Sequence, residues 1–183
     1  MVVPILVIPN KILTTPCEKV STIDEEIKEV AQNLLDTARK ARNPGAAGLA
    51  APQIGSLKRV CIVRRFLETR ENSGDEAPSV DYVLINPKIT DFSEDTDVRY
   101  EGCLSVPNTF AAIERAKKIK VKALNENGEE IRLKANGFFA RIIQHEVDHL
   151  NGILITDKAV GKTLTEKEID EMINRETQPK KLG

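Results

Sequence analysis

The sequence predicts an α+β fold with short strands and a few helices, and three observations support it. Two stretches, 23–42 and 136–151, show the apolar spacing of amphipathic helices. A third stretch near the C-terminus begins with a helix-capping pattern. Short apolar or alternating segments elsewhere have the length and composition of β-strands. No internal repeat is visible, and the 183 residues suffice for a single domain, residues 1–183, with a real core.

The composition is that of a globular protein, with 40% hydrophobic and 30% charged residues. Lys and Arg (27) nearly balance Asp and Glu (28), so the net charge of −1 gives no electrostatic case for nucleic acid or an anionic membrane as a partner. No apolar run could span a bilayer, and the N-terminus lacks the basic start of a signal peptide. Three scattered cysteines form no disulfide framework, so we expect a reducing, cytoplasmic setting.

The first predicted helix covers residues 23–42, where apolar side chains recur at helical spacing. Thr22 and Glu25 form a capping box at its start. Two apolar segments, RVCIVRRF at 59–66 and YVLINPKIT at 82–90, are predicted to be strands. The polar segment between them, 69–79, contains Gly and Pro and is predicted to be a loop inserted within the domain.

The next predicted element is a β-hairpin. Residues 118–124 alternate charged and apolar side chains, Asn127-Gly128 supplies a turn, and the alternation resumes at Ile131 and Leu133. We therefore interpret the basic run KKIKVK as the solvated face of a hairpin. Thr165 and Glu168 then form a second capping box, which opens a mixed-charge helix to about residue 176.

The central predicted helix carries HEVDH at 145–149, and these five residues hold both histidines of the chain. Asn136 can cap this helix, and Asn151-Gly152 is a typical C-terminal signal. At about 100° per residue, the apolar side chains share one face and the polar ones the other. The predicted apolar face consists of Phe138, Phe139, Ile142, Ile143 and Leu150, and the predicted polar face of Arg141, Gln144, Asp148 and Asn151.

His145 and His149 fall at the edge of that apolar face, one turn apart, and Glu146 projects near its middle. Two imidazoles at i and i+4 can both reach one metal ion. A carboxylate within an apolar face is costly unless a charge compensates it. Two core histidines with Glu146 paired to an arginine would be the plainer interpretation, but a metal site gives all three polar groups one cause. We therefore predict a metal site.

A catalytic metal site of this type needs a third protein ligand and an open position for water. The chain has no third histidine, so the spacing leaves two classes of candidate. One is the thiolate of Cys103, in EGCLSVP, where a strand is expected to end with the backbone at Gly102 close to a neighbour. The other is a carboxylate of the last helix, and spacing alone does not rank the two classes. The candidate carboxylates are Glu166, Glu168 and Glu171.

Three motifs in order, GLAAPQIG at 48–55, EGCLS at 101–105 and QHEVDHL at 144–150, resemble the signature motifs of the peptide deformylase family. The opening PILVIPNKIL is also similar to that family's N-terminal segment, so the resemblance covers roughly residues 3–160. It implies antiparallel strands packed around the central HExxH helix, with N-terminal and C-terminal helices. The implied reaction removes the formyl group from the N-terminal methionine of newly synthesised polypeptides and releases formate.

The resemblance also implies a role for individual residues. Glu146 would be the general acid/base, while Gln53 and the backbone N–H of Leu104 would polarise the formyl oxygen. The substrate would be held by the Gly48 backbone, with Ala47 and Gly102 beside it. Phe138 and Ile142 are candidate walls of a methionine pocket, with ordinary core packing as the alternative. The implied metal ligands are Cys103, His145 and His149.

The resemblance further implies one divalent ion, with Fe²⁺ as the native metal and Zn²⁺, Ni²⁺ or Co²⁺ as substitutes in purified protein. The expected protein is a cytoplasmic monomer, with an organelle as the alternative compartment, and its last helix is a candidate ribosome contact. Ala46 and Phe110 depart from the family pattern, at positions that usually hold a glycine and a basic residue. Arg115, Glu101 and Asp148 are expected to orient the histidines. A peptidase with a glutamate ligand and a non-enzymatic metal protein are the rival interpretations.

Overall fold

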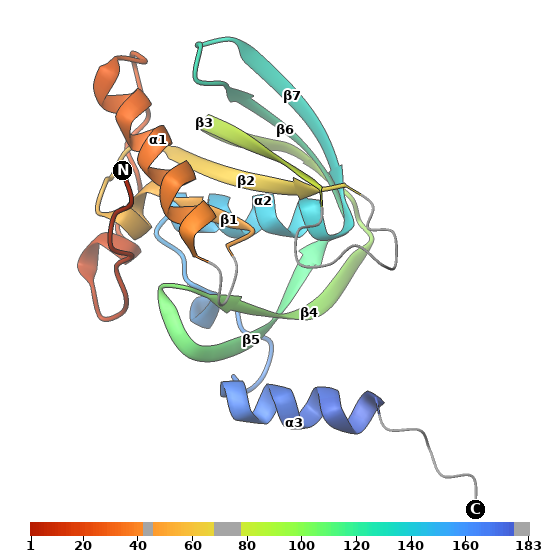
Figure 1. Ribbon diagram of the computed structural model, residues 1–183. Coiled ribbons are helices and arrows are strands. Elements are labelled where there is room, and N and C mark those ends of the chain that lie inside the picture. The colour runs from red at the N-terminus through yellow and green to blue at the C-terminus, as the bar shows by residue number, and fades with distance from the viewer. Residues whose placement is uncertain (42–45, 68–77, 178–183) are drawn as a thin grey trace, which may run out of the picture.

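The computed structural model describes residues 1–41, 46–67 and 78–177, and it confirms the predicted α+β class (Figure 1). A five-stranded antiparallel sheet has the order β1-β2-β3-β6-β7, and β4 and β5 form a separate hairpin. The two cover different sides of the helix α2 (Gly137–Leu150), which packs against β1, β2 and β5. The strands are β1 Gly48–Ala50, β2 Val60–Phe66, β3 Ser79–Phe92, β4 Thr96–Cys103, β5 Val106–Ala116, β6 Lys118–Leu124 and β7 Glu130–Asn136.

The two faces of the sheet are covered by different helices because successive side chains of β2 point in opposite directions. Val60 and Ile62 belong to a core shared with α1 (Glu25–Lys40), whereas Cys61 and Val63 belong to a core shared with α2. These four side chains are all fully buried, which explains why this part of β2 is a continuous apolar run in the sequence. A smaller third core lies under β5 and includes Leu13, Val106, Ala111, Ile113, Leu154 and Ile155.

The helix α1 confirms the helix predicted at 23–42, but the predicted cap is wrong. Asp24, not Thr22, is the N-cap, and its carboxylate accepts a hydrogen bond of 3.1 Å from the backbone N–H of Ile27. A carboxylate at this end also interacts favourably with the partial positive charge of the helix N-terminus. An uncharged hydroxyl such as that of Thr22 lacks this interaction. The helix therefore begins three residues after the predicted capping residue.

The strands predicted at 59–66 and 82–90 correspond to β2 and to the middle of the longer β3. The predicted hairpin is confirmed as β6 and β7, with the lysines of β6 exposed and Ile119, Val121 and Ala123 between them buried. Its turn depends on Asn125, whose side chain accepts hydrogen bonds from the N–H groups of Asn127 and Glu129. Gly128 takes the left-handed conformation, with φ of 82°, that the turn requires. The predicted loop at 69–79 lies outside the described residues, apart from 78 and 79.

The hairpin of β4 and β5 was not predicted, apart from the end of a strand at Cys103. Most residues of β4 are exposed and the one that is buried, Glu101, is charged, so this strand has no apolar alternation by which a pattern could find it. The hairpin exists because β4 pairs with β5, which is anchored by Ala111 and Ile113 in the third core. The strand β1, with three residues, is likewise too short to be recognised from sequence.

The prediction of one polar face on α2 is wrong. Arg141 and Gln144 are buried like the apolar residues, because the hairpin packs against the side of the helix that faces away from the sheet. Gln144 bonds both backbone groups of Ala116, and Arg141 bonds the buried Glu101 and the half-buried Asp97 of β4. Asn136 is the N-cap by position, but its side chain makes no capping hydrogen bond. The helix ends as predicted before Gly152, whose φ is 72°.

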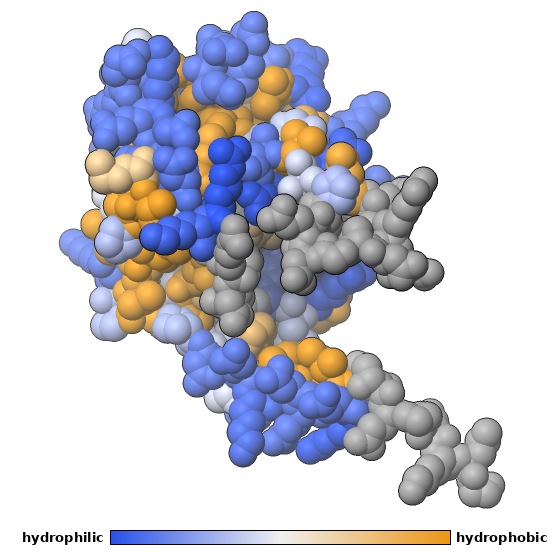
Figure 2. Space-filling view, viewed as in Figure 1, coloured by the Kyte–Doolittle hydropathy of each residue, from blue (hydrophilic) through white to orange (hydrophobic). Residues whose placement is uncertain are grey.

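The third helix, α3 (Glu166–Thr177), begins at the predicted capping box. The Thr165 hydroxyl accepts a bond of 3.3 Å from the Glu168 N–H, and the Glu168 carboxylate accepts one of 2.7 Å from the Thr165 N–H. The helix packs on β5 and projects from the body, with a largely hydrophilic outer surface (Figures 1 and 2). Three short 3₁₀ helices complete the described chain: η1 Lys11–Thr14, η2 Ala51–Ile54 and η3 Ile155–Asp157. Within the described residues, no helix combines the length and apolar character needed to cross a membrane.

Candidate metal centre and active-site cleft

A cleft of about 520 Å³ lies between β1 and η2 on one side and the β4–β5 hairpin on the other, with α2 as its floor. Nearly all predicted site residues line it, although they come from three distant parts of the chain. The residues from the first motif are Ala47, Gly48 and Gln53, those from the second are Gly102, Cys103 and Leu104, and those from α2 are Phe138, Ile142, His145 and Glu146. His149 reaches the same point from one helical turn below His145.

Cys103, His145 and His149 form a compact group of potential metal ligands, and their donor atoms all lie within 4.8 Å of one another. The Cys103 Sγ is 3.2 Å from the His149 Nε2, and the two imidazole rings have centroids 5.0 Å apart. The i, i+4 spacing on α2 explains the proximity of the histidines. Cys103 joins them because β4 ends there, with a shift of register between Gly102 and Cys103.

Glu101 fixes the orientation of His145. The His145 Nδ1 donates to the Glu101 Oε2 at 3.0 Å, so its Nε2 is left for a metal. The same buried carboxylate accepts two bonds of 2.9 Å from Arg115 and one of 2.7 Å from Arg141. Burial alone would raise the pKa of Glu101, but the bonds from Arg115 and His145 hold it well below its usual range. Glu101 is therefore an anion that can support a metal-binding imidazole.

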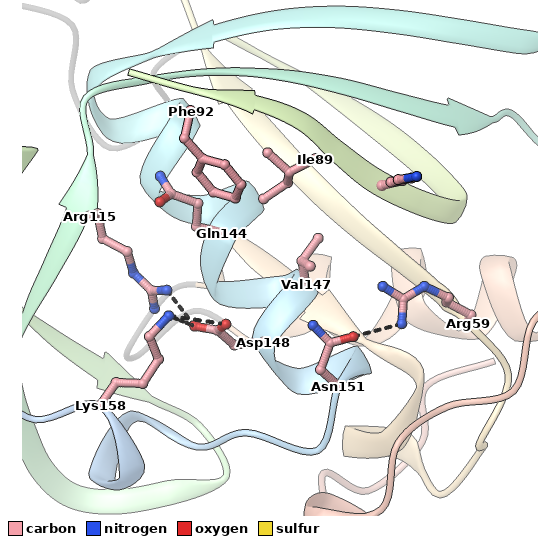
Figure 3. A pocket seen from close by; sticks show the side chains of 10 residues that line it. Arg59, Ile89, Phe92, Arg115, Gln144, Val147, Asp148, Asn151 and Lys158 are labelled. Atoms are coloured by element: carbon pink, nitrogen blue, oxygen red, sulfur yellow. Dashed lines mark hydrogen bonds and ion pairs between the residues drawn. The ribbon is translucent and has the colours of Figure 1, made fainter. Parts of the chain in front are cut away.

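The expected group of Arg115, Glu101 and Asp148 lies together behind the histidines. Arg115 bridges the carboxylates of Glu101 and Asp148. Figure 3 shows the Asp148 end of this group, where Lys158 adds a second cation at 3.1 Å from Asp148. Sequence analysis missed Arg141, which also bonds Glu101. Nothing in the sequence indicated this role, because Arg141 lies on the face of α2 that was predicted to be polar. That face is buried only because the β4–β5 hairpin packs against it.

His149 is almost completely buried, and burial lowers its pKa to about 3. A neutral imidazole is the form that binds metals. Its Nδ1 atom has no hydrogen-bond partner among the described residues, and neither has the Oε2 of Glu146. Buried polar atoms without partners are rare and call for an explanation. Water coordinated to a divalent cation would give the Glu146 Oε2 a partner, and the His149 Nε2 already faces the Cys103 Sγ at 3.2 Å, so the residues fit a Cys-His-His metal centre.

Glu146 lies under the first motif. Burial raises its pKa to about 7, within the range suited to proton transfer at neutral pH. Its side chain occupies the space beside Gly48, since a Cβ added to Gly48 would lie 2.5 Å from the Glu146 Oε1. The glycine of this motif therefore allows β1 to pass directly over the carboxylate. Ala46, the departure from the family pattern, is buried two residues earlier and leaves this contact intact.

Gln53 presents its amide N–H groups to the cleft in a fixed orientation. Its Oε1 accepts a bond of 2.9 Å from the Ala50 N–H, so its Nε2 must point the other way. The Nε2 donates to the Ser105 hydroxyl at 3.1 Å and lies 3.8 Å from the Cys103 Sγ. Ser105 is a second residue that sequence analysis missed, although it belongs to the EGCLS motif.

The two predicted pocket walls lie at different depths. Ile142 is 5% exposed and lies inside the cleft, whereas Phe138 is 55% exposed and stacks on Phe66 at 6.1 Å between ring centroids. Phe138 is therefore part of the mouth of the cleft. Phe110, where the family often has a basic residue, packs over Gly102, whose added Cβ would lie 2.9 Å from the ring.

The carboxylates considered as alternative third ligands lie elsewhere. Glu166 is at the rim of the cleft, Glu168 caps α3, and Glu171 is in contact with Lys167 and Arg175 on α3. None of the three belongs to the Cys-His-His group found among the described residues. Of the other cysteines, Cys61 is fully buried and Cys17 partly so, and burial raises the pKa of both thiols.

Comparison with known proteins gives one consistent family. The model of the family described as polypeptide deformylase matches residues 2–165. A peptide deformylase of Bacillus subtilis is 41% identical over 165 residues, which cover 90% of this chain and 93% of that protein. The crystal structure of the peptide deformylase from Ehrlichia chaffeensis superposes with a TM-score of 0.77 at 36% identity, covering 96% and 94% of the two chains. A Met-Ala-Ser-bound peptide deformylase from Acinetobacter baumannii gives a TM-score of 0.74 at 37% identity, covering 86% and 98%.

Proposed function

The chain belongs to the polypeptide deformylase family, and we propose the part that each of its own residues plays in the family's reaction. This reaction hydrolyses the amide bond that joins the formyl group to the N-terminal methionine of polypeptides. The observation that carries this proposal is the group of three donor atoms within 4.8 Å on the floor of the cleft, beside a buried carboxylate oxygen that has no hydrogen-bond partner in the described part of the chain. The proposed metal ligands are Cys103, His145 and His149.

A divalent ion held by these three residues would supply a Lewis acid that makes water nucleophilic at neutral pH. Glu146 accepts the proton of the attacking water and delivers it to the departing amine, so that formate and a free N-terminus leave the site. Its fixed place between Gly48 and His145 suits a proton carrier that is not itself a ligand. Glu101 keeps the His145 ring oriented throughout.

The formyl oxygen becomes negatively charged during attack, and two neutral donors are proposed to stabilise it. One is the amide of Gln53, whose direction is fixed by the bond that its oxygen accepts from Ala50. The other is the backbone N–H of Leu104, directly after the cysteine ligand. Preorganised donors of this kind typically contribute about 3–4 kcal/mol each to transition-state stabilisation.

The substrate peptide is proposed to lie along β1. This strand is at the edge of the five-stranded sheet, and Ala47 and Gly48 line the cleft. An edge strand can pair with an extended peptide through main-chain hydrogen bonds. The methionine side chain would then enter the apolar part of the cleft at Ile142, with Phe138 at the mouth and Gly102 on the facing hairpin.

Fe²⁺ is the proposed native ion, because a donor set of one thiolate and two imidazoles suits both Fe²⁺ and Zn²⁺ and the family resemblance favours iron. Three free cysteines, one of them the proposed thiolate ligand, suit a reducing compartment, so we propose that the protein acts in the cytoplasm. We also propose that residues 1–183 act as one monomeric domain. The projecting helix α3, with Ile173 half exposed, is the proposed contact with the ribosome (Figure 1).

The test is formate release from formyl-Met-Ala by protein purified without oxygen, with its metal content measured on the same sample. Turnover that follows iron content and is lost on chelation would support the proposal. Metal binding without formate release would indicate a protein that keeps the ion for stability alone. Cleavage of internal peptide bonds would indicate a peptidase.

A further inference from the structure

A second cavity, of about 290 Å³, lies on another side of α2 from the cleft, between β3, α2 and η3 (Figure 3). None of the residues proposed to bind the metal or the substrate lines it. This volume is at the small end of ligand pockets, roughly 300–1,000 Å³. The lining residues are Arg59, Lys88, Ile89, Phe92, Arg115, Gln144, Val147, Asp148, Asn151 and Lys158.

The lining carries a local excess of positive charge. Four basic side chains surround one acidic one, although the whole chain has a net charge of −1. Asp148 is shared between Arg115 and Lys158, and Arg115 also pairs with Glu101, so the excess charge of the lining lies on Arg59 and Lys88. Arg59 hydrogen-bonds only neutral oxygens within the described chain, those of Leu150, Pro87 and Asn151. Lys88 is exposed beside it, so positive charge at this end of the cavity is not neutralised by Asp148.

The opposite wall is apolar. Phe92 and Ile89 extend from β3 over the cavity, and Val147 lies on the α2 side (Figure 3). Phe92 is 57% exposed, so its ring is accessible to a molecule in the cavity. An aromatic and aliphatic wall facing basic groups suits a molecule with one anionic end and one apolar end.

We propose that this cavity binds a small organic anion, a carboxylate or a phosphate carried on a short apolar group. The anionic end contacts Lys88 and Arg59, and the apolar end packs on Phe92. The wall of the cavity is also joined to the metal centre, because Asp148 contacts Arg115, which donates to Glu101 beside His145.

The experiment titrates the zinc-loaded protein with phenyl phosphate and with benzoate and follows the backbone amide resonances by NMR. Saturable shifts are expected at Ile89 and Phe92 of β3, which separates this cavity from binding at the metal. Lys88→Glu should weaken binding of both anions at least fivefold. The control is Lys134→Glu, which makes the same charge change at an exposed position of β7 outside the cavity, and it should alter binding less than twofold.

The relative affinities of phenyl phosphate and benzoate decide which anionic group the cavity prefers. Inorganic phosphate and benzyl alcohol, which each supply only one end of the proposed ligand, should bind at least fivefold more weakly than the preferred anion. The proposal is refuted if neither aromatic anion gives saturable shifts at these residues, or if the two variants lose binding equally. It is also refuted if inorganic phosphate or benzyl alcohol binds as tightly as the aromatic anions.

Discussion

Gly48→Ala should disable the enzyme by displacing Glu146 without removing any functional group. An added Cβ would lie 2.5 Å from the Glu146 Oε1 and 2.8 Å from its Cγ and Cδ, whereas ordinary contact begins at 3.4 Å. The carboxylate oxygen must therefore move by about 3.4 − 2.5 = 0.9 Å, and the Cγ by about 0.6 Å. Because the Cγ is also too close, the end of the side chain cannot resolve the clash by rotating alone.

The expected effect on turnover is large, because a misplacement of about 1 Å at a reacting group can cost roughly 10²-fold in rate. We therefore expect kcat for formyl-Met-Ala to fall roughly 10²-fold, with the metal retained. Overpacking of a buried site typically costs about 1–3 kcal/mol. For a chain of this size that corresponds to a fall in Tm of about 2–12 °C. Turnover, metal content and the free energy of unfolding are measured on one preparation.

The control is a double-mutant cycle with Glu146→Ala, which removes the atoms that the new methyl group meets. Gly48 lies in β1 with a backbone that alanine can adopt, so in this background Gly48→Ala should be neutral or stabilise by up to about 1 kcal/mol. Equal destabilisation in both backgrounds would show that the clash is not with Glu146. Wild-type turnover of Gly48→Ala would refute the reasoning altogether.

Of the four further predictions, three concern the active site and the fourth concerns stability. Metal analysis should show loss of the ion from three alanine variants, Cys103→Ala, His145→Ala and His149→Ala. The ion should be retained by Cys17→Ala and Cys61→Ala. Full metal content in Cys103→Ala would contradict the assignment of Cys103 as a ligand. Glu146→Gln should keep the fold and the metal but lose at least roughly 10²–10⁴ in kcat, because the amide cannot carry the proton; near-normal turnover would contradict its role. Formyl-Met-Ala should be hydrolysed at least tenfold more efficiently than formyl-Gly-Ala, because each methylene buried near Ile142 contributes about 0.8 kcal/mol; equal kcat/KM values would exclude the pocket. The hydrogen bond from Arg64 holds the pKa of Asp81 below its usual range, so the ionised carboxylate stabilises the fold at pH values above its ordinary pKa. This stabilisation is lost as the pH falls through the lowered pKa, so Asp81→Asn should lower Tm at pH 7 by more than it does in acid. A difference in Tm that does not depend on pH would contradict this.

The local part of the structure could be predicted from sequence where the pattern is strong. The helix α2, its end at Asn151 and Gly152, the hairpin β6–β7 and the capping box at Thr165 all depend on neighbours within a few residues. The cap of α1 was misassigned because two capping residues, Thr22 and Asp24, stand close together and only the backbone geometry chooses between them. The hairpin β4–β5 was missed because its exposed strand has no periodicity of its own.

The sequence by itself determined the motif helix, the spacing of His145 and His149 on it, and the family to which the three motifs point. Spacing alone left the third ligand open between Cys103 and the carboxylates of α3. Only the tertiary structure brought Cys103 to the histidines, because β4 must pair with β5 and end beside α2. The same packing buried Arg141 around Glu101 and set Glu146 against Gly48. These contacts join residues some 40 to 100 positions apart, and no periodicity within one segment carries information about its distant neighbours.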